Sequence, residues 1–233
     1  MDINSPPDVG VIKALALSNL PLTGKAYEFG CGTARNLSAV AKKFPSRSVG
    51  FELEPSMIDS AKERIKQRHV KATIVYQDVL KKTLRSNTVS FAIVGTAIYW
   101  PKSVVVKFLN SLWAALLVNG VLHIEFSTPK DSVLKSDFVR YTCLPYPDEG
   151  YQNSFGHYCG YDCMMDHPGV IGASFWTKDE VHQALGSLGE IRYVHQHLRA
   201  WNQKTTEIDP DTGKKTQEKT FRSFYVVTIQ KVG

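Results

Sequence analysis

Short apolar segments alternate with amphipathic ones through the first half of the chain, and this alternation limits the possible folds more than any other feature. Segments of strand length begin at Ala26 and at residues 48, 72, 89 and 121. Between them, apolar residues recur at the spacing of one helix face. Strands that alternate with helices form a parallel sheet, because each crossover runs through a helix that covers the sheet. The sequence therefore predicts an α/β fold with a doubly wound, Rossmann-like sheet.

The expected helices have recognisable ends. Apolar residues at helical spacing predict a first helix within residues 9–20 and later ones within 35–44, 55–65 and 105–116. The pair Asn119-Gly120 predicts the C-cap of the helix over 105–116. A strand from 121 to 126 then follows.

The last part of the chain differs from the alternating part. A helix is expected from Thr177, and residues 191–201 and 221–230 predict two strands separated by a polar stretch. These strands predict an antiparallel C-terminal hairpin, which brings the sheet to seven strands. A chain of 233 residues suits one core, so we expect a single domain over 1–233.

Residues 127–176 interrupt this regularity with a long insertion. The part between Tyr141 and Thr177 holds eight aromatic rings and four acidic residues but no Lys or Arg. Loops of this length in a compact domain usually serve a function. We interpret the insertion as a lid over a binding site, whose aromatic faces can hold a planar or cationic ligand.

A glycine-rich turn follows the first strand and is the most informative motif. Glu28 ends the strand, and Gly30 and Gly32 let the backbone turn sharply and approach a ligand. Glu52, at the end of the second strand, can accept both hydrogen bonds of a ribose diol. Asp78, at the end of the third strand, is placed to accept from an adenine amino group.

With these residues the chain resembles the class I S-adenosylmethionine-dependent methyltransferases of small-molecule type, from about Val9 to its end. The first motif, the ribose acid, the adenine-side acid and the fourth-strand exit each have a counterpart. The resemblance implies S-adenosylmethionine as cofactor and a seventh strand that enters antiparallel between the fifth and sixth. It also implies these cofactor-binding residues: Glu28, Gly30, Gly32, Glu52, Asp78, Val79 and Thr96. Two positions depart from the family pattern, Ala34 at the third glycine and Ala92 within the fourth strand.

A nicotinamide dinucleotide is the competing ligand for such a turn. In the dinucleotide motif the third small residue falls at Arg35, where helix and strand must pack closely. Glu28 would also repel a pyrophosphate, whereas it suits the amino end of S-adenosylmethionine. Both residues argue against a dinucleotide. The remaining alternative is that the glycines and acids are only structural.

The acceptor side is less defined. We expect Tyr99 and Trp100, just after the fourth strand, to face the same cavity as the lid. The candidate substrate-binding residues are Tyr99, Trp100, Tyr151, Tyr158 and Tyr161. No catalytic base is assigned, and the candidates for one are His157, His167, Tyr99 and Glu125.

The lid also contains zinc-type side chains. His157, Cys159, Cys163 and His167 have ligand atoms, and the last three would share one face of a helix. Their spacing matches no common zinc signature, so no metal site is predicted. Reduced cysteines packed in the lid are the simpler interpretation.

The distribution of charge separates the possible acceptors. The net charge of +6 allows a nucleic-acid substrate. However, the positive charge lies in residues 35–85, which flank the cofactor half and carry a net charge of +7. The lid, which is expected to cover the acceptor, is acidic. We therefore predict a methyltransferase for a small molecule, with an aromatic or amine-bearing acceptor favoured and nucleic acid disfavoured. The alternatives are an RNA or protein methyltransferase and a non-catalytic S-adenosylmethionine-binding partner protein.

The remaining expectations concern location. The longest apolar runs are far shorter than the roughly 20 residues that span a bilayer, so we expect that the chain is not an integral membrane protein. The N-terminal residues lack the pattern of a secretory signal, and four cysteines are too few for a disulfide scaffold. The sequence thus predicts a cytoplasmic chain with reduced thiols. It leaves the oligomeric state open.

Overall fold

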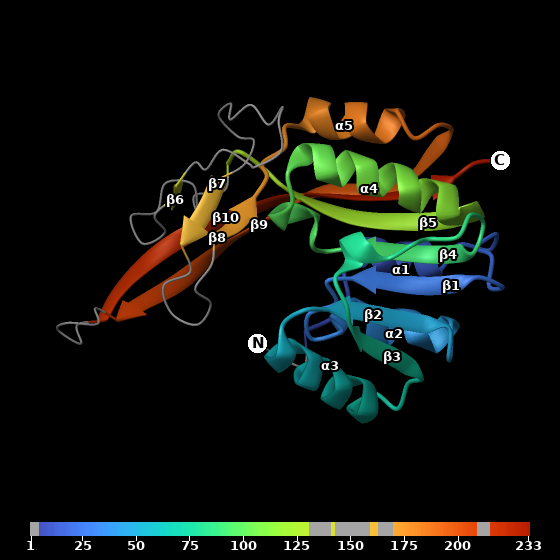
Figure 1. Cartoon of the computed structure of the whole chain (residues 1–233), viewed down its shortest axis with the longest axis horizontal. Coiled ribbons are helices and arrows are strands. Elements are labelled where there is room, and N and C mark those ends of the chain that lie inside the picture. Colours follow the sequence, from blue (N-terminus) through green and yellow to red (C-terminus); the bar gives the residue numbers. More distant parts are fainter. Residues whose placement is uncertain (1–4, 131–140, 143–158, 163–169, 209–214) are drawn as a thin grey trace.

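A seven-stranded sheet forms the centre of the molecule (Figure 1). The computed structural model describes residues 5–130, 141–142, 159–162, 170–208 and 215–233. The strand order of the seven-stranded sheet is β3-β2-β1-β4-β5-β10-β9. Strands β1 to β5 are parallel to one another and β10 is antiparallel to both of its neighbours. The strands are β1 (Lys25–Phe29), β2 (Ser48–Glu52), β3 (Ala72–Tyr76), β4 (Val89–Val94), β5 (Leu116–Ser127), β9 (Ile191–Ile208) and β10 (Lys215–Lys231). The α/β fold, the seven strands and the antiparallel hairpin are confirmed.

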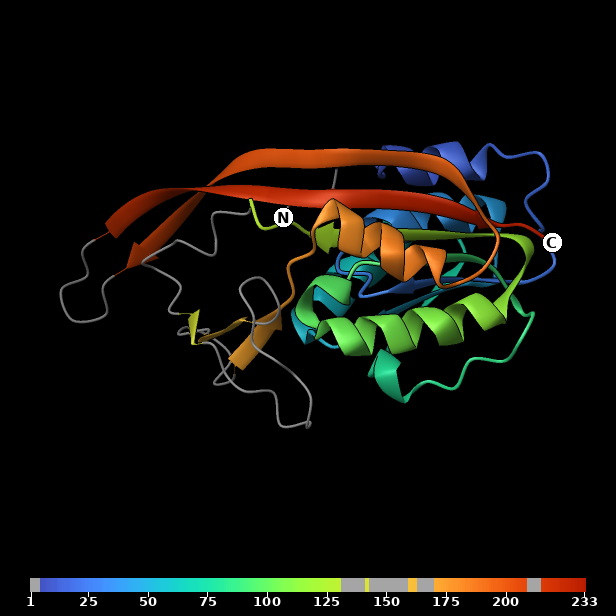
Figure 2. The same cartoon turned by 90° about the horizontal axis from the view of Figure 1, so that it is seen from above.

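Helices cover both faces of the sheet (Figure 2). Three pack on one face, and two pack on the other against the largest apolar cluster. The first group is α1 (Val9–Leu15), α2 (Arg35–Lys43) and α3 (Pro55–Gln67), and the second is α4 (Lys102–Ala115) and α5 (Lys178–Gly186). Two short 3-10 helices, η1 (Val79–Lys81) and η2 (Ala97–Tyr99), follow β3 and β4. The arrangement has three layers and is doubly wound.

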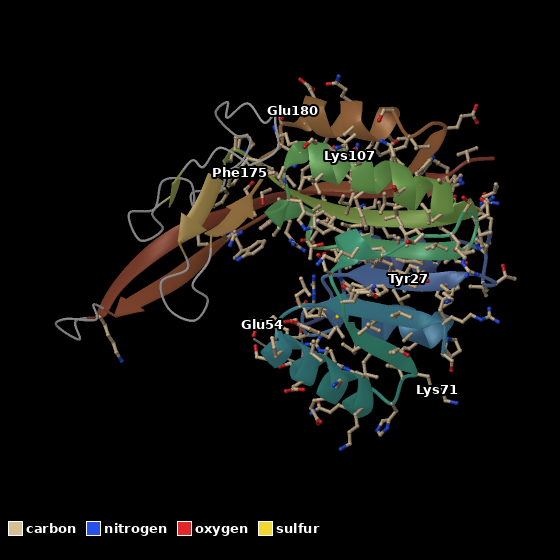
Figure 3. The ribbon with its side chains drawn as sticks, viewed as in Figure 1. Tyr27, Glu54, Lys71, Lys107, Phe175 and Glu180 are labelled. Carbon is tan, nitrogen blue, oxygen red and sulfur yellow. The ribbon has the colours of Figure 1, made fainter. Side chains whose placement is uncertain are left out.

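Helix α5 begins with a complete capping box. The Thr177 hydroxyl accepts from the Glu180 amide, and the Glu180 carboxylate accepts from the Thr177 amide. Glu180 also pairs with Lys102 at 2.6 Å, which ties the first turn of α5 to that of α4. Figure 3 shows Glu180 at this end of α5, above α4. The helix expected from Thr177 is confirmed, with Thr177 as its N-cap.

The C-terminal hairpin is longer than the sequence predicted. Residues 203–208 and 215–219, which we expected to be a polar connection, continue the strands, and the pairing runs from Lys215 opposite Ile208 to Lys231 opposite Ile191. A ladder of backbone hydrogen bonds needs no apolar side chains, so the apolar pattern ended before the strands did. The distal half of the hairpin extends past the end of β5 (Figure 1).

Two helix ends were also predicted wrongly. Helix α4 ends at Ala115, because Leu116 already pairs with Val89 as the first residue of β5. Asn119 has the left-handed conformation expected of a cap, with φ of 63°, but it lies inside β5. The first helix ends at Leu15 rather than near Leu20, although Leu20 is still buried in the cluster beneath α1.

The insertion at 127–176 contains a second, three-stranded antiparallel sheet. Its strands are β6 (Tyr141–Thr142), β7 (Cys159–Asp162) and β8 (Val170–Ala173). Cys159 therefore lies in a strand, and the helical arrangement considered for Cys159, Cys163 and His167 is wrong at this residue. The positions of Cys163 and His167 lie outside the described residues.

No helix in the described part of the chain is both long and apolar enough to cross a membrane.

An aromatic cluster fills the core between β1, β2 and α4. The Phe29 ring stacks on Phe51 at 5.3 Å with an angle of 9° between the rings, and it meets Phe108 of α4 edge-on at 5.1 Å. Tyr27 meets both phenylalanines of the strands edge-on. Such contacts add to the stability gained from apolar burial.

We expect Phe29→Ala to lower the free energy of unfolding by about 3–5 kcal/mol, because Phe29 is fully buried and its removal leaves a cavity. Leu22→Ala, at a half-exposed position, should cost about 0.5 kcal/mol or less. Urea denaturation of both variants measures the difference. Equal losses would contradict the position of Phe29 in the core.

Candidate cofactor and acceptor site

The glycine turn between β1 and α2 leaves open space on one side. Gly30 has φ of +71°, and a Cβ there would lie 2.0 Å from the Thr96 Cγ2 atom, so β1 and β4 approach closely at this point. Gly32 has φ of +49°, and no described atom lies within 4 Å of where its Cβ would be. Ala34 also has a left-handed backbone, with φ of 58°. A glycine, which the motif usually has at this position, adopts that conformation at lower cost. A ligand can therefore approach the backbone closely at Gly32.

Glu52 is fixed beside this turn at the end of β2. Its Oε2 atom accepts from the Gly32 amide at 2.7 Å, and its Oε1 atom accepts from the amides of Leu53 at 2.8 Å and Glu54 at 3.1 Å. A carboxylate has about four acceptor sites, so one remains for a ligand. The structure thus joins Gly32 and Glu52 by a hydrogen bond.

Asp78 and Val79 lie at the corresponding end of β3. The Asp78 carboxylate accepts from the Leu80 amide at 3.0 Å and caps η1, and it lies 3.9 Å from the Lys81 ammonium. Val79 is buried in the main apolar cluster. Thr96 follows β4, and its hydroxyl is buried without a hydrogen-bond partner among the described residues. An unpaired buried hydroxyl next to a glycine turn fits a bound polar ligand.

Glu28 is a buried acid in β1 whose carboxyl group lies at the first turn of α2. Its carboxyl group accepts from the Leu37 amide at 2.8 Å, in the first turn of that helix. Burial raises the pKa of Glu28 to about 8, despite the opposing effects of the Leu37 amide and of Arg35. A neighbouring cation favours the ionised form, so this position is suited to a positively charged ligand group.

A cavity of about 460 Å³ opens at the carboxyl ends of β1, β4 and β5, where doubly wound sheets bind their ligands. Its volume is in the range of small-molecule sites. The lining residues are Ser5, Glu28, Gly30, Cys31, Thr33, Arg35, Asn36, Ile93, Gly95, Glu125, Arg199 and Trp201. Of the predicted site residues, the cavity joins Glu28, Gly30 and Glu125. Gly32 and Glu52 lie together at the adjoining turn, and Asp78 lies at the end of the next strand.

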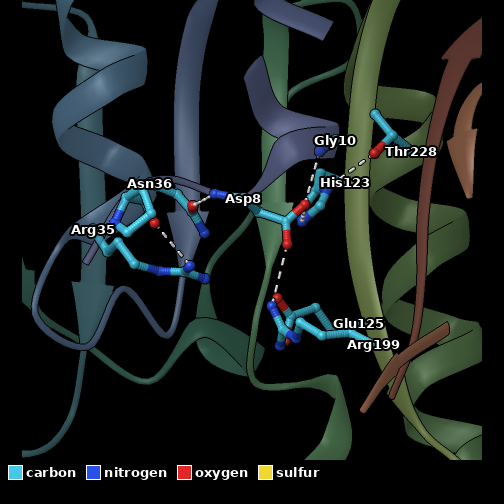
Figure 4. Close-up of polar contacts among 9 residues, drawn as sticks. Asp8, Gly10, Arg35, Asn36, His123, Glu125, Arg199 and Thr228 are labelled. Carbon is cyan, nitrogen blue, oxygen red and sulfur yellow. Dashed lines mark hydrogen bonds and ion pairs between the residues drawn. The ribbon is translucent and has the colours of Figure 1, made fainter. Parts of the chain in front are cut away.

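One wall of the cavity is a charge bridge (Figure 4). The Arg199 guanidinium donates from Nη2 to Glu125 Oε2 at 2.5 Å and from Nη1 to Asp8 Oδ2 at 3.2 Å. Burial alone would raise the pKa of Asp8, but His123, the Gly10 amide and Arg199 hold it below its usual value. Asp8 and Glu125 are therefore both bound to one cation.

An aromatic pair supports this bridge. Trp201 and Phe224 stack at 5.2 Å with an angle of 16°, and the Arg199 guanidinium lies 5.3 Å and 5.4 Å from their ring centres. Trp201 is partly exposed and lines the cavity. A planar or cationic group could pack on its face.

His123 lies beneath the bridge and is fully buried. Its Nδ1 atom is 2.8 Å from the Thr228 hydroxyl, and its Nε2 atom is 3.8 Å from Asp8 Oδ1 without a hydrogen bond. Burial lowers the pKa of His123, so the ring is neutral at pH 7. Ligand-type atoms of Asp8, His123 and Glu125 lie within 4.8 Å of one another. Arg199 already supplies the positive charge between the two carboxylates.

The sequence analysis did not identify Asp8, His123, Arg199 and Trp201 as site residues. The hydrogen bonds of Arg199 to Asp8 and Glu125, and that between His123 and Thr228, join positions more than 70 residues apart, which no local motif records. One signal was present, because His123 and Glu125 occupy alternate positions within an otherwise apolar strand. Alternate residues of a strand point to the same face, so the pair indicates a polar site on one side of β5.

Of the other predicted residues, Trp100 is the one whose side chain the structure describes. Trp100 packs edge-on against Phe108 at 5.1 Å and joins the main core, so it is not among the residues that line the cavity. Tyr99 lies in η2 and Tyr161 in β7, and only their backbones are described. The predictions for Tyr151, His157, Tyr158, Cys163 and His167 fall outside the described residues.

Comparisons with known proteins agree on the fold and the domain. Residues 26–120 match the family model for a methyltransferase domain. No curated protein sequence matches the chain. The chain is similar to an S-adenosylmethionine-dependent methyltransferase from Mesorhizobium loti, at 13% identity over 99% of this chain and 100% of that one, with a TM-score of 0.60.

Two further solved structures are similar. An S-adenosylmethionine-dependent methyltransferase from Clostridium acetobutylicum is 13% identical over 96% of this chain and 90% of that one, with a TM-score of 0.59. A protein studied for the conversion of a disulfide bond into a thioacetal group during echinomycin biosynthesis is 17% identical. That match covers 99% of this chain and 84% of the other, with a TM-score of 0.56. At these identities the likeness concerns the fold.

We expect Glu28 to make stability depend on pH. The folded chain keeps the Glu28 proton up to about pH 8, whereas a carboxyl group with its ordinary pKa loses it near 4.5. The folded state thus binds more protons over this range, so the Glu28 contribution to the free energy of unfolding falls as the pH rises. Glu28→Gln removes this titration. Its stability relative to the wild type should increase from about pH 4.5 to about pH 8 and then level off.

Urea denaturation of both proteins at a series of pH values measures this difference. Glu63→Gln, which changes an exposed carboxylate on α3, is the matched control. A stability difference between Glu28→Gln and wild type that is constant over the whole range would contradict the raised pKa.

Proposed function

We propose that this chain is a class I S-adenosylmethionine-dependent methyltransferase and that it transfers the methyl group to a small molecule with an amine or an aromatic ring. The observation that carries the proposal is the cavity at the carboxyl edge of the sheet. It runs from the glycine turn at Gly30 to the wall formed by Glu125, Arg199 and Trp201. A donor on the turn side and a small acceptor at the wall would share one space.

The cofactor side of the cavity has one acidic and one basic residue, which suit the ammonium and the carboxylate of an amino acid. S-adenosylmethionine supplies an electrophilic methyl group on a sulfonium, and its methionine part carries an ammonium and a carboxylate. Glu28 lines the cavity beside the glycine turn and would bind the ammonium, because a neighbouring cation favours the ionised form of this carboxyl group. Arg35 lines the same cavity and is placed to bind the carboxylate. Sequence reasoning used Arg35 only to argue against a dinucleotide.

The nucleoside side lies beyond Gly32. Glu52 is held by three backbone amides and keeps an acceptor site for the ribose hydroxyls. Asp78 and Val79 are placed for the adenine, the first by its carboxylate and the second by its apolar surface. The free Thr96 hydroxyl is a further polar contact for the same ligand.

The acceptor side is suited to an amine or a ring. Glu125 presents a carboxylate to the cavity, and Trp201 presents a partly exposed aromatic face. Because Arg199 is bound to two carboxylates, its charge is compensated and offers little to an anionic acceptor. Among the base candidates from the sequence, Glu125 lines the cavity. Methyl transfer is an in-line displacement, so holding the acceptor in position is the main task of these residues.

The alternatives concern the acceptor and its size. A nucleic-acid substrate needs a continuous basic surface for phosphates, whereas the charged residues of this cavity are two acids and two bases. The cavity volume suits a small molecule better than a protein segment. A non-catalytic partner protein would bind the cofactor but transfer nothing. A cytoplasmic location stays part of the proposal.

We expect Glu52→Ala to raise the dissociation constant for S-adenosylmethionine by about tenfold or more. The change removes hydrogen bonds to a charged group, each of which is worth about 1.5–3 kcal/mol, and it also frees the Gly32 amide. Isothermal titration calorimetry measures the affinity. Glu63→Ala removes an exposed carboxylate from α3 and should leave the affinity unchanged. Equal affinities for the wild type and Glu52→Ala would overturn the role of Glu52.

We expect labelled methyl groups to enter small molecules when the protein is incubated with a metabolite extract and labelled S-adenosylmethionine. Glu125→Gln keeps the shape of the cavity wall but removes the carboxylate charge, so it should transfer about tenfold less label. Chromatography of the small-molecule, RNA and protein fractions locates the label. Label only in RNA or protein would overturn the small-molecule proposal, and no label in any fraction would favour the partner protein.

A further inference from the structure

The segment before α1 forms part of the cavity. Residues 5–8, here called the N-terminal strap, place Ser5 in the cavity lining. The Pro6 carbonyl accepts from Arg35 Nη1 at 3.0 Å, and the Asp8 amide donates to the Asn36 side-chain oxygen at 2.8 Å. Arg35 and Asn36 line the cavity themselves. The strap is therefore bound to residues that border the cofactor.

The Asp8 side chain connects the strap to the opposite wall. Its Oδ1 atom accepts from the Gly10 amide at 2.8 Å, and its Oδ2 atom accepts from Arg199 Nη1 at 3.2 Å. Arg199 comes from β9, 191 residues later in the chain. The Asp8 carboxylate is almost fully buried, at 4% exposed, so water screens this ion pair weakly.

The second terminal nitrogen of the Arg199 guanidinium, Nη2, donates a hydrogen bond to Glu125 Oε2 at 2.5 Å. The planar guanidinium can bind two carboxylates at once with fixed directions, which a lysine ammonium does less well. Stacking against Trp201 and Phe224 fixes its plane. One side chain thus links the strap, the acceptor wall and the aromatic pair.

We infer that Arg199 is a positioning residue that holds the N-terminal strap against the cavity through Asp8 and thereby slows the release of S-adenosylmethionine. The inference rests on the proposed function, because it assumes that the cofactor occupies the cavity beside Glu28 and Arg35. Arg199 acts through Asp8 on one side and through Glu125 on the other.

The electrostatics explain why the strap depends on Arg199. Without the guanidinium, the carboxylates of Asp8 and Glu125 face each other with oxygen atoms within 4.8 Å. Removing one partner from a buried ion pair leaves the others uncompensated, which is costly. The strap carries one of these charges, so the loss of Arg199 removes its attachment to the opposite wall and adds a repulsion there.

We expect Arg199→Gln and Asp8→Asn each to increase the dissociation rate of S-adenosylmethionine by about tenfold. The association rate should change less, because most effects of contact loss are in the dissociation rate. Because the two residues act through one contact, the double variant should release the cofactor at about the rate of Arg199→Gln. Arg199→Lys, which keeps the charge, should recover part of the slow release.

The measurement is a chase experiment, in which protein loaded with labelled S-adenosylmethionine is diluted into unlabelled cofactor and the retained label is followed in time. Arg222→Gln is the matched control, because Arg222 packs on the same Phe224 ring from β10 without lining the cavity. A purely structural role would lower the melting temperature and the amount of label bound, but not the rate at which bound label leaves. Dissociation rates within twofold of wild type for both Arg199→Gln and Asp8→Asn would overturn the inference.

Hydrogen exchange of the wild type provides a test that needs no variant. S-adenosylmethionine should slow exchange at the amides of Asp8 and Gly10. Unchanged exchange there, in a protein that binds the cofactor, would overturn the inference while the proposed function stands. A wild-type protein that does not bind S-adenosylmethionine would overturn both.

Discussion

The pairing of β10 between β5 and β9 is the constraint on which the cavity wall formed by Glu125 and Arg199 depends. Antiparallel pairing sets Val226 opposite Glu125 on one side and opposite His197 on the other, and it sets Phe224 opposite Arg199. Arg199 can reach Glu125 only because of this register. A shift by one residue would turn the side chains of β9 to the other face of the sheet. The cavity wall is thus a consequence of strand pairing, although its two charged residues are 74 positions apart.

Much of the fold was predictable because its signals are local. Helix and strand periodicities near the glycine turn directly reflect which side chains are buried, and the turn itself needs residues that tolerate positive φ. Such local signals indicated Gly32 and Glu52, and the structure shows that a hydrogen bond joins these two residues, which lie 20 positions apart. The end of α4 was predicted wrongly because Asn119-Gly120 is typical of a helix C-cap. In the structure Asn119 has the left-handed conformation of such a cap, but it lies within β5.

The polar network behind the cavity was not predictable in the same way. Asp8 reads as an ordinary N-cap, and Arg199 reads as a surface residue of an edge strand. Their contact depends on the tertiary arrangement alone, because the N-terminus and β9 meet over one face of the sheet. Trp100 illustrates the reverse, since its place after β4 indicated the cavity but its ring packs on Phe108. Local sequence identifies where a chain turns toward a ligand better than which side chains reach it.

The two acids of the cavity illustrate how the surroundings decide what one residue type does. Glu28 has helix amides and apolar surroundings, and its raised pKa leaves it mostly neutral at pH 7 until a cation arrives. Glu125 lies against the Arg199 guanidinium, so its carboxylate is already paired. The negative charge at Glu28 therefore depends on a neighbouring cation, whereas the negative charge at Glu125 is built into the fold. Because the Glu125 carboxylate also raises the pKa of Glu28, a change that removes Arg199 would act on both residues at once.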